Sequence, residues 1–472
     1  MIDLSLAVRN LLRNRRRSFA TFIALAIGTA SILLFGGFSA NIKLSMQTAY
    51  VSTGGHLQIQ HRDFFLYGSG DPTAYGIRNY RELIETINAD PLLQPQLLVV
   101  TPSLQFGSIA GNYDAGVSRT VIGLGLVASD YNRMRVWNEF GLPQTTPPFV
   151  LDGAPDDAAI VGTGVARVLQ LCEALQVQGC EARGTQALDD ALTLLAEATA
   201  LPDDIAELAL GETPASVPQQ AGTVPKVELL ASRAGGTPNV VSVQVIRAER
   251  QGFKELDEIY VMLQLPQAQR LVYGRDDAEA TAVMVQLRHS AQVRDAKARL
   301  EALLQSAGGG QPLVVLDFEE LNPFYVQTIG MFDTIFGFIF LLIGTIVLFT
   351  VSNTMNTAVV ERTVEIGTIR AIGLRAAGVQ RLFVLEGSLL GVSGAISGAL
   401  FALAAAAAVN QLGLTWLPPG AGDRLPLVLL VSSVPVMVVG TTLGLSLIAT
   451  LSAWLPARRA ARLAIVDALR HV

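Results

Sequence analysis

Charged residues are scarce in this chain of 472 residues. Only 16% of the residues are Asp, Glu, Lys or Arg, against about a quarter in soluble domains, while 50% are hydrophobic and the mean hydropathy is +0.42. This composition excludes an ordinary soluble enzyme and indicates a membrane protein. The 34 basic and 40 acidic residues leave a net charge of −6, so no basic excess is available for a nucleic-acid backbone. We therefore expect no nucleic-acid partner.

Motifs for nucleotide, metal and nucleophilic chemistry are also missing from the sequence. The chain has no G-x-x-x-x-G-K-[ST] loop for phosphates, no H-E-x-x-H zinc motif and no G-x-S-x-G nucleophile elbow. Its four histidines are scattered along the chain, at His56, His61, His289 and His471. We therefore expect no catalytic activity, no cofactor and no metal ion in this chain.

Four long stretches contain no charged residue. They cover residues 18–42, 334–360, 387–422 and 425–457. Each stretch exceeds the roughly 20 residues that a helix needs to cross a bilayer. The sequence predicts transmembrane helices at residues 18–42, 329–356, 381–409 and 427–455, with a short interfacial hairpin at residues 410–426.

The remaining charges predict the orientation in the membrane. Residues 41–333 carry 20 basic and 34 acidic residues, whereas the rest of the chain carries 14 basic and 6 acidic residues. Short arginine-rich flanks face the cytoplasm in most membrane proteins. Such flanks predict cytoplasmic segments at residues 1–17, 357–380 and 456–472, so both termini are expected in the cytoplasm. An extracytoplasmic domain follows for residues 43–328.

The first 17 residues predict a helix that lies in the cytoplasmic interface. One helical face is apolar and contains Leu4, Val8, Leu11 and Leu12. Asn10 and Arg13 lie away from that face. An apolar stripe with arginines beside it is typical of a helix on a membrane surface. The alternative is a disordered basic flank that only sets the topology.

Strand and helix patterns alternate in the extracytoplasmic segment, which predicts an α+β domain. Strands are expected at residues 55–60, 97–100, 260–265, 281–287 and 313–318, and helices at residues 78–89, 266–272 and 291–304. Residues 173–224 are richer in Ala, Leu, Asp and Glu, which predicts a helical insertion. Its acidic residues fit a solvated helix face, with a surface for a cation as the alternative.

Cys172 and Cys180 are the two cysteines of the chain, and both fall in the extracytoplasmic segment. Oxidising compartments favour disulfides, and the short spacing allows a small closed loop. The sequence therefore predicts a Cys172–Cys180 disulfide. Two unpaired thiols are the main alternative, because no histidine lies close in sequence to complete a metal site.

The connection between the second and third predicted spans reads E-R-T-V-E-I-G-T-I-R-A-I-G, from Glu361 to Gly373. Arg362 and Glu365 are three residues apart, so we expect them to meet on one helix face. Gly373 can end the helix in the left-handed conformation. A short cytoplasmic helix tied directly to two spans can transmit a push from a cytoplasmic partner into the membrane.

Glu386 lies near the start of the third predicted span. It follows Arg381 by five residues, which misses the spacing of three or four that a helix-face pair needs. A charge inside a membrane span is a functional candidate by default. The alternative is an interfacial carboxylate that only fixes the depth of the helix.

The run from Glu361 to Gly373 resembles the E-R-x-x-E-I-G-x-x-R-A-x-G signature of ABC-transporter permeases of the MacB, FtsX and lipoprotein-releasing (LolC/LolE-like) type. Glu386, within Leu385-Glu386-Gly387, resembles the glutamate that the family has at the start of the third span. Residues 456–461 and 468–470 resemble the C-terminal ending of the family. Matches in the outer segment, at residues 159–166, 253–257 and 267–271, are less specific.

The resemblance implies an α-helical protein of the bacterial inner membrane with four spans and a MacB-type periplasmic α+β core between the first two. It implies that a cytoplasmic ABC ATPase dimer, which binds the ATP, couples through Glu361, Arg362, Glu365, Gly367, Arg370 and Gly373. A second permease copy or a paralogue would complete the dimer. ATP-driven motion would then act on lipoproteins or other amphiphiles from the membrane or the periplasm. The alternatives are an FtsX-like regulator of a periplasmic cell-wall hydrolase and a MacB-like exporter of drugs or peptides.

Overall fold

The computed structural model describes residues 2–13, 15–68, 70–143, 146–177, 224–233, 236–251, 254–274, 278–416, 425–465 and 468. The chain divides into two compact units. The helical unit comprises Met1–Met46, Phe324–Trp416 and Leu425–Val472, and the sheet unit comprises Gln47–Pro323 and Leu417–Arg424. The sheet unit thus lies between the first and second long apolar helices in the sequence.

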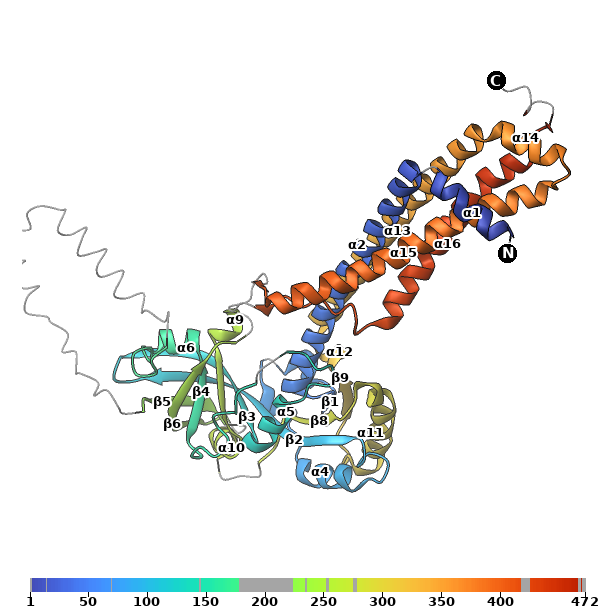
Figure 1. Ribbon diagram of the computed structural model, residues 1–472. Helices are drawn as coiled ribbons and strands as arrows, with labels where there is room; N and C mark the ends of the chain where they lie inside the picture. Colours follow the sequence, from blue (N-terminus) through green and yellow to red (C-terminus); the bar gives the residue numbers. More distant parts are fainter. Residues whose placement is uncertain are drawn as a thin grey trace, which may run out of the picture. The chain divides into compact units, whose positions relative to one another are not determined.

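The helices of the helical unit are α1 (Ile2–Arg13), α2 (Arg15–Gly54), α13 (Pro323–Glu361), α14 (Thr363–Ala371), α15 (Ala376–Leu412) and α16 (Pro435–Ala461), shown in Figure 1. Among the described residues, α2, α13, α15 and α16 are long and apolar enough to cross a membrane, with 40, 39, 37 and 27 residues. They confirm the four apolar helices expected from the sequence. Helix α2 also continues well beyond its predicted end at residue 42.

The predicted start of the fourth span, at residue 427, is wrong. Helix α16 begins at Pro435, which occupies the first turn of the helix. Proline suits that position because its missing N–H has no partner there, while the residue before a proline is disfavoured in a helix. The hairpin expected before this helix is present at its two ends, where β10 (Thr415–Trp416) pairs antiparallel with β11 (Leu425–Pro426).

Glycines let α15 and α16 approach closely. A Cβ added to Gly387 would lie 2.3 Å from Cβ of Ala453, and one added to Gly391 would lie 2.6 Å from Cβ of Ala449. Helices in a membrane associate largely through such close packing of small residues. This contact positions the first turns of α15, which carry Glu386.

The described part of the sheet unit contains one sheet of nine strands. They are β1 (Leu57–His61), β2 (Leu97–Asn112), β3 (Val117–Leu126), β4 (Ala158–Gly162), β5 (Lys226–Ser232), β6 (Pro238–Glu249), β7 (Tyr260–Gln264), β8 (Ala282–Leu287) and β9 (Leu313–Asp317). The order is β3-β7-β4-β6-β5-β2-β8-β1-β9, and β2 also pairs with β3. This extra pairing closes six strands into a ring, while β8, β1 and β9 continue from the first half of β2 (Figure 1).

Helices cover the sheet and complete several apolar clusters, of which two are the largest. The helices are α3 (Phe64–Tyr67), α4 (Tyr80–Ala89), α5 (Ala128–Arg135), α6 (Thr163–Val168), α9 (Lys254–Asp257), α10 (Leu265–Tyr273), α11 (Val293–Ala307) and α12 (Phe318–Leu321), with 3-10 turns at Pro72–Tyr75 and Ser290–Gln292. One core belongs to the ring and contains Phe106 and Val243. The other joins α4 and α11 to the extension of the sheet, through Leu83, Leu300 and Val285.

The structure confirms the strands and helices that the sequence predicts in this α+β unit, within a few residues at their ends, except that the strand expected at residues 97–100 continues to Asn112. Strands β3, β5 and β6 were not predicted. The predicted insertion at residues 173–224 lies largely outside the described residues, as does Cys180. The Cys172–Cys180 disulfide therefore stays a prediction.

Candidate functional site

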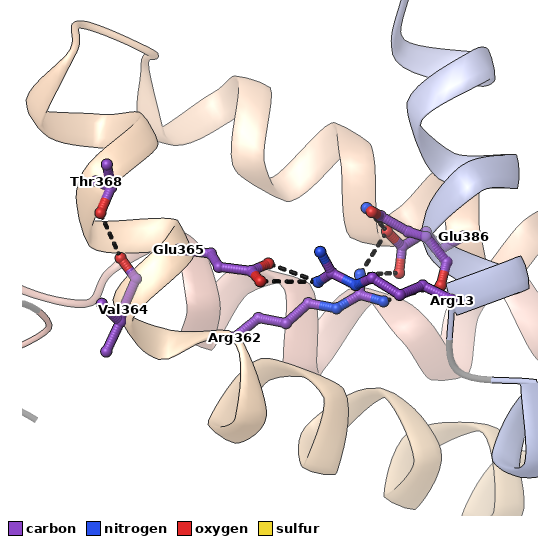
Figure 2. Close-up of polar contacts among 7 residues, drawn as sticks. Arg13, Arg362, Val364, Glu365, Thr368 and Glu386 are labelled. Atoms are coloured by element: carbon purple, nitrogen blue, oxygen red, sulfur yellow. Dashed lines mark hydrogen bonds and ion pairs between the residues drawn. The ribbon is translucent and has the colours of Figure 1, made fainter. Parts of the chain in front are cut away.

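A polar cluster connects α1, α15 and the junction between α13 and α14 (Figure 2). Helix α13 ends at Glu361 and α14 begins at Thr363, so Arg362 lies between the two helices. Its φ of −106° and ψ of 15° break the helical path at this one residue. The break turns the Arg362 side chain into the helical unit.

Arg362 and Glu386 form a buried ion pair. Nη1 of Arg362 donates to both carboxylate oxygens of Glu386, at 3.1 and 3.3 Å. The two side chains are 7% and 2% exposed. Burial of two charges is costly unless they pair and use their remaining hydrogen-bonding capacity. The stability of this ion pair therefore depends on hydrogen bonds from the groups that surround it.

Helix α1 supplies the additional hydrogen bonds. Nδ2 of Asn10 donates to Oε1 of Glu386 at 2.6 Å, and the backbone oxygen of Asn10 accepts from Nη2 of Arg362 at 3.0 Å. One residue thus contacts both charges. Leu11, the next residue, packs against the apolar core of the helical unit, which also contains Ile366. Helix α1 is therefore part of the same packed structure as α14 and α15.

Two exposed ion pairs lie beside the buried one. Nη2 of Arg13 contacts both carboxylate oxygens of Glu365, at 2.9 and 2.7 Å, as Figure 2 shows. Arg17, at the start of α2, donates to both oxygens of Glu361 at 2.8 and 2.7 Å. The side chains of Arg13 and Glu365 are 53% and 52% exposed, so water screens their attraction. These pairs align the helices but stabilise them little.

Helix α14 presents two different faces. Thr363, Ile366 and Gly367 are buried against the helical unit. On the opposite side, Val364 is 46% exposed, and Ile372, directly after the helix, is 83% exposed. Exposed apolar residues next to charged ones are typical of an interaction surface.

The end of α14 is held by two further features of the predicted motif. Nη1 of Arg370 donates to the backbone oxygen of Leu463, which follows α16. Gly373 has a φ of +111°, a value that few residues other than glycine adopt. The positive φ predicted for Gly373 is confirmed. All six motif residues are therefore near α14, but Arg362 and Gly367 are buried while Glu361 and Glu365 are exposed.

The structure gives Arg362 and Glu386 different partners from those considered in the sequence. The predicted pair of Arg362 with Glu365 is wrong, because Arg362 precedes the helix and points to Glu386, whereas Glu365 pairs with Arg13. Glu386 has its partner 24 residues away in the sequence, at Arg362. Asn10 and Arg13 were not predicted as site residues. Their place off the apolar face of α1 is the signal that could have identified them.

Among the residues that the structure describes, no group of three His, Cys, Asp or Glu side chains is arranged to hold a metal ion. The site is instead a set of hydrogen bonds and ion pairs between helices. Such an arrangement can transmit a displacement from one helix to another.

Comparison with known proteins finds a family match for the part of the chain that contains Arg362, Glu386 and α14. Residues 334–465 match the family model described as "FtsX-like permease C-terminal". This range includes α14, Arg362 and Glu386.

Individual relatives are similar over shorter regions. The lipoprotein-releasing system transmembrane protein LolC of Neisseria meningitidis is 26% identical over 248 residues, which are 50% of this chain and 57% of LolC. The macrolide export ATP-binding/permease protein MacB of Escherichia coli is 36% identical over 143 residues, which are 30% of this chain and 20% of MacB. The chain thus spans less than two thirds of the length of either relative.

The solved structures that are similar include the periplasmic region of MacB from Actinobacillus actinomycetemcomitans. It has 11% sequence identity and a TM-score of 0.30, and the match covers 58% of this chain and 94% of that structure. The signature at α14 and the match over residues 334–465 carry the assignment. Residues 334–465 are thus assigned to the FtsX-like permease C-terminal family, and the chain is similar to ABC-transporter permeases of the LolC and MacB type.

Proposed function

We propose that this chain is the permease subunit of an ABC transporter of the bacterial inner membrane, with both termini in the cytoplasm. It works with a second permease copy or a paralogue and with a separate cytoplasmic ATPase dimer. We place the nucleotide on a separate ATPase chain, since this sequence contains no phosphate-binding loop of the G-x-x-x-x-G-K-[ST] type. The observation that carries the proposal is the divided surface of α14.

The exposed face of α14 is the docking surface for the ATPase. Val364, Ile369 and Ile372 are 46%, 40% and 83% exposed, and Glu365 lies among them. Burial of such side chains contributes about 1.5–3 kcal/mol each when it is complete. A partner that covers this face therefore binds α14 firmly enough to move it.

The buried face of α14 passes that movement on. Arg362 is bonded to Glu386 of α15 and to Asn10 of α1, so a shift of α14 also moves the first turns of α15 and the last turn of α1. Breaking a buried ion pair costs about 3–5 kcal/mol, far above thermal energy. The three helices therefore respond as one body, and the long helices α13 and α15 carry the motion across the membrane.

The motion acts on a lipoprotein or another amphiphile on the periplasmic side, where the sheet unit lies. Each methylene of an acyl chain stabilises its membrane-bound state by about 0.8 kcal/mol. The acyl chains of a multiply acylated protein together stabilise its membrane-bound state by roughly tens of kcal/mol. Such a protein therefore does not leave the membrane spontaneously. Hydrolysis of ATP supplies the free energy for extraction.

The test uses the permease reconstituted with its ATPase in proteoliposomes. The Ile372→Asp variant should lose most of the coupling between permease and ATPase, because a charge replaces the most exposed apolar residue of the docking surface. A Val136→Asp variant provides the matched control, because Val136 is 64% exposed but belongs to the sheet unit. ATPase stimulation and ATP-dependent release of a triacylated lipoprotein are measured together.

Full stimulation of the ATPase by the Ile372→Asp variant would contradict the docking role of α14. Coupled ATP hydrolysis without lipoprotein release, together with activation of a peptidoglycan hydrolase, would favour the regulatory alternative instead.

A further inference from the structure

The sheet unit contains a hollow of about 300 Å³ beside the end of α2. Gln58 and Gln60 of β1 and Gln105 of β2 line it, and Phe64 and Phe65 of α3 form an aromatic wall. None of the described residues that line this amide hollow carries a charge. The hollow therefore offers hydrogen bonds and apolar contact but no ionic partner.

A chain of hydrogen bonds fixes the orientation of two amides in the amide hollow. The backbone oxygen of Gly54, at the end of α2, can only accept, so Gln58 turns its Nε2 toward it at 2.9 Å. Oε1 of Gln58 therefore faces Gln60 and accepts from its Nε2 at 2.7 Å. This order leaves Oε1 of Gln60 as the acceptor at the end of the chain.

Oε1 of Gln60 has no hydrogen-bond partner within the described part of the structure. Gln60 is 4% exposed and lines the hollow. Buried polar atoms are nearly always paired, and an unpaired acceptor costs about 1–3 kcal/mol. A ligand that donates an O–H or N–H to Gln60 removes this cost.

An apolar surface continues from the amide hollow along α3. Phe65 lines the hollow and is 44% exposed, and the next two residues, Leu66 and Tyr67, are 70% and 64% exposed. Three consecutive large apolar side chains that remain accessible are suited to cover an aliphatic chain. The polar and apolar surfaces are thus adjacent, as the two ends of an amphiphile require.

We propose that the amide hollow and α3 together bind an amphiphile with an uncharged head that donates hydrogen bonds, such as a hydroxyl or amide group. The head lies against Gln60, and the chain lies along Phe65, Leu66 and Tyr67. An anionic head is disfavoured because the hollow offers it no cation. This inference rests on the proposed function, in which an amphiphile is the substrate, and it names the class of head group.

The test uses the full chain in lipid nanodiscs and a photoreactive dodecyl glucoside. Mass spectrometry locates the label, and unlabelled dodecyl glucoside or dodecyl sulfate competes for it. We expect the competable label on residues 64–67, with the glucoside competing at least about tenfold better than the sulfate.

Two variants that each replace an exposed leucine distinguish a specific binding site from nonspecific apolar binding. Leu66→Ser should reduce the competable label about fivefold or more, because the chain loses an apolar contact. Leu92→Ser changes a leucine that is 61% exposed elsewhere in the sheet unit, and it should leave the label unchanged. In addition, Gln60→Met should weaken glucoside binding about two- to tenfold and reduce the preference over the sulfate. The Leu66 and Leu92 variants decide the matter if Gln60→Met does not fold.

Competable label outside α3, equal competition by dodecyl sulfate, or an unchanged label in the Leu66→Ser variant would each overturn the proposal. The binding experiment contains neither ATPase nor nucleotide. Its failure therefore leaves the Ile372→Asp test of the transport function unaffected.

Discussion

Removal of one member of the buried Arg362–Glu386 pair should destabilise the helical unit strongly, while removal of both should not. A single substitution leaves an unpaired charge with side-chain exposure of only 7% or 2%, which costs about 3–5 kcal/mol. Replacement of both residues by apolar side chains of similar volume removes both charges together. Such replacements are often neutral, or stabilising by about 1–4 kcal/mol.

The structure also predicts which single variant is worse. In Arg362→Met, Glu386 still accepts from Asn10 at 2.6 Å, and the carboxylate can become neutral by taking up a proton. In Glu386→Met, Arg362 keeps one bond, to the backbone oxygen of Asn10, and among the described residues its buried Nε has no partner. A guanidinium cannot lose its charge in a protein. Glu386→Met should therefore be the more destabilising change, near the upper end of the range of about 3–5 kcal/mol.

Thermal or denaturant unfolding of the purified permease provides the measurement, analysed as a double-mutant cycle. We expect a coupling energy of about 3 kcal/mol or more for Arg362 with Glu386. The Arg13–Glu365 pair, whose side chains are 53% and 52% exposed, is the control and should give about 0–1 kcal/mol. Equal coupling energies in the two cycles would refute the reasoning from burial.

The same double variant separates stability from transmission. If Arg362 and Glu386 transmit motion, the double variant should fold well but lose the coupling of ATP hydrolysis to substrate release. Full coupling in a stable double variant would show that the pair does not transmit the motion.

Two further predictions concern burial in each unit. Burial lowers the pKa of His56 to about 4, so the neutral form stabilises the sheet unit fully above pH 6.5. That stabilisation, about 3 kcal/mol in all, should be lost as the pH falls from 6.5 toward 4, as measured by hydrogen exchange in β1 and β8. An equal loss in a His56→Gln variant would contradict this cause. Gly387→Ala should destabilise the helical unit by about 1–3 kcal/mol, since the new Cβ would lie 2.3 Å from that of Ala453. Gly337→Ala, whose new Cβ would have no described atom within 4 Å apart from the backbone of its own helix and its chain neighbours, should be neutral or stabilising in the same thermal assay. A matching loss there would exclude the packing explanation.

Local patterns in the sequence identify much of the fold. The uncharged stretches predicted α2, α13, α15 and α16, because a bilayer requires a long run of apolar residues wherever the chain crosses it. The glycine of the α14 motif predicted its own positive φ, because that conformation strains residues with a side chain. Hydropathy does not specify where a helix begins, and Pro435 sets the start of α16.

The ring of strands could not be predicted in the same way. Strand β2 pairs with β3, β5 and β8, and the pairing of β2 with β3 is what closes the ring. Alternating side chains indicate that a segment is a strand, but they do not specify which strand lies beside it. That choice depends on the packing of the complete apolar core.

The pattern of apolar and charged residues specifies four apolar helices, a charged helix between the second and third, and an α+β segment between the first and second. The partners of the charges depend on the packing of the helices. Glu386 lies 24 residues from Arg362 and 376 residues from Asn10, and it meets both because α15 packs against α1 and the α13–α14 junction. Spacing along one helix predicts pairs within that helix, whereas a pair between helices requires knowledge of how the helices are packed.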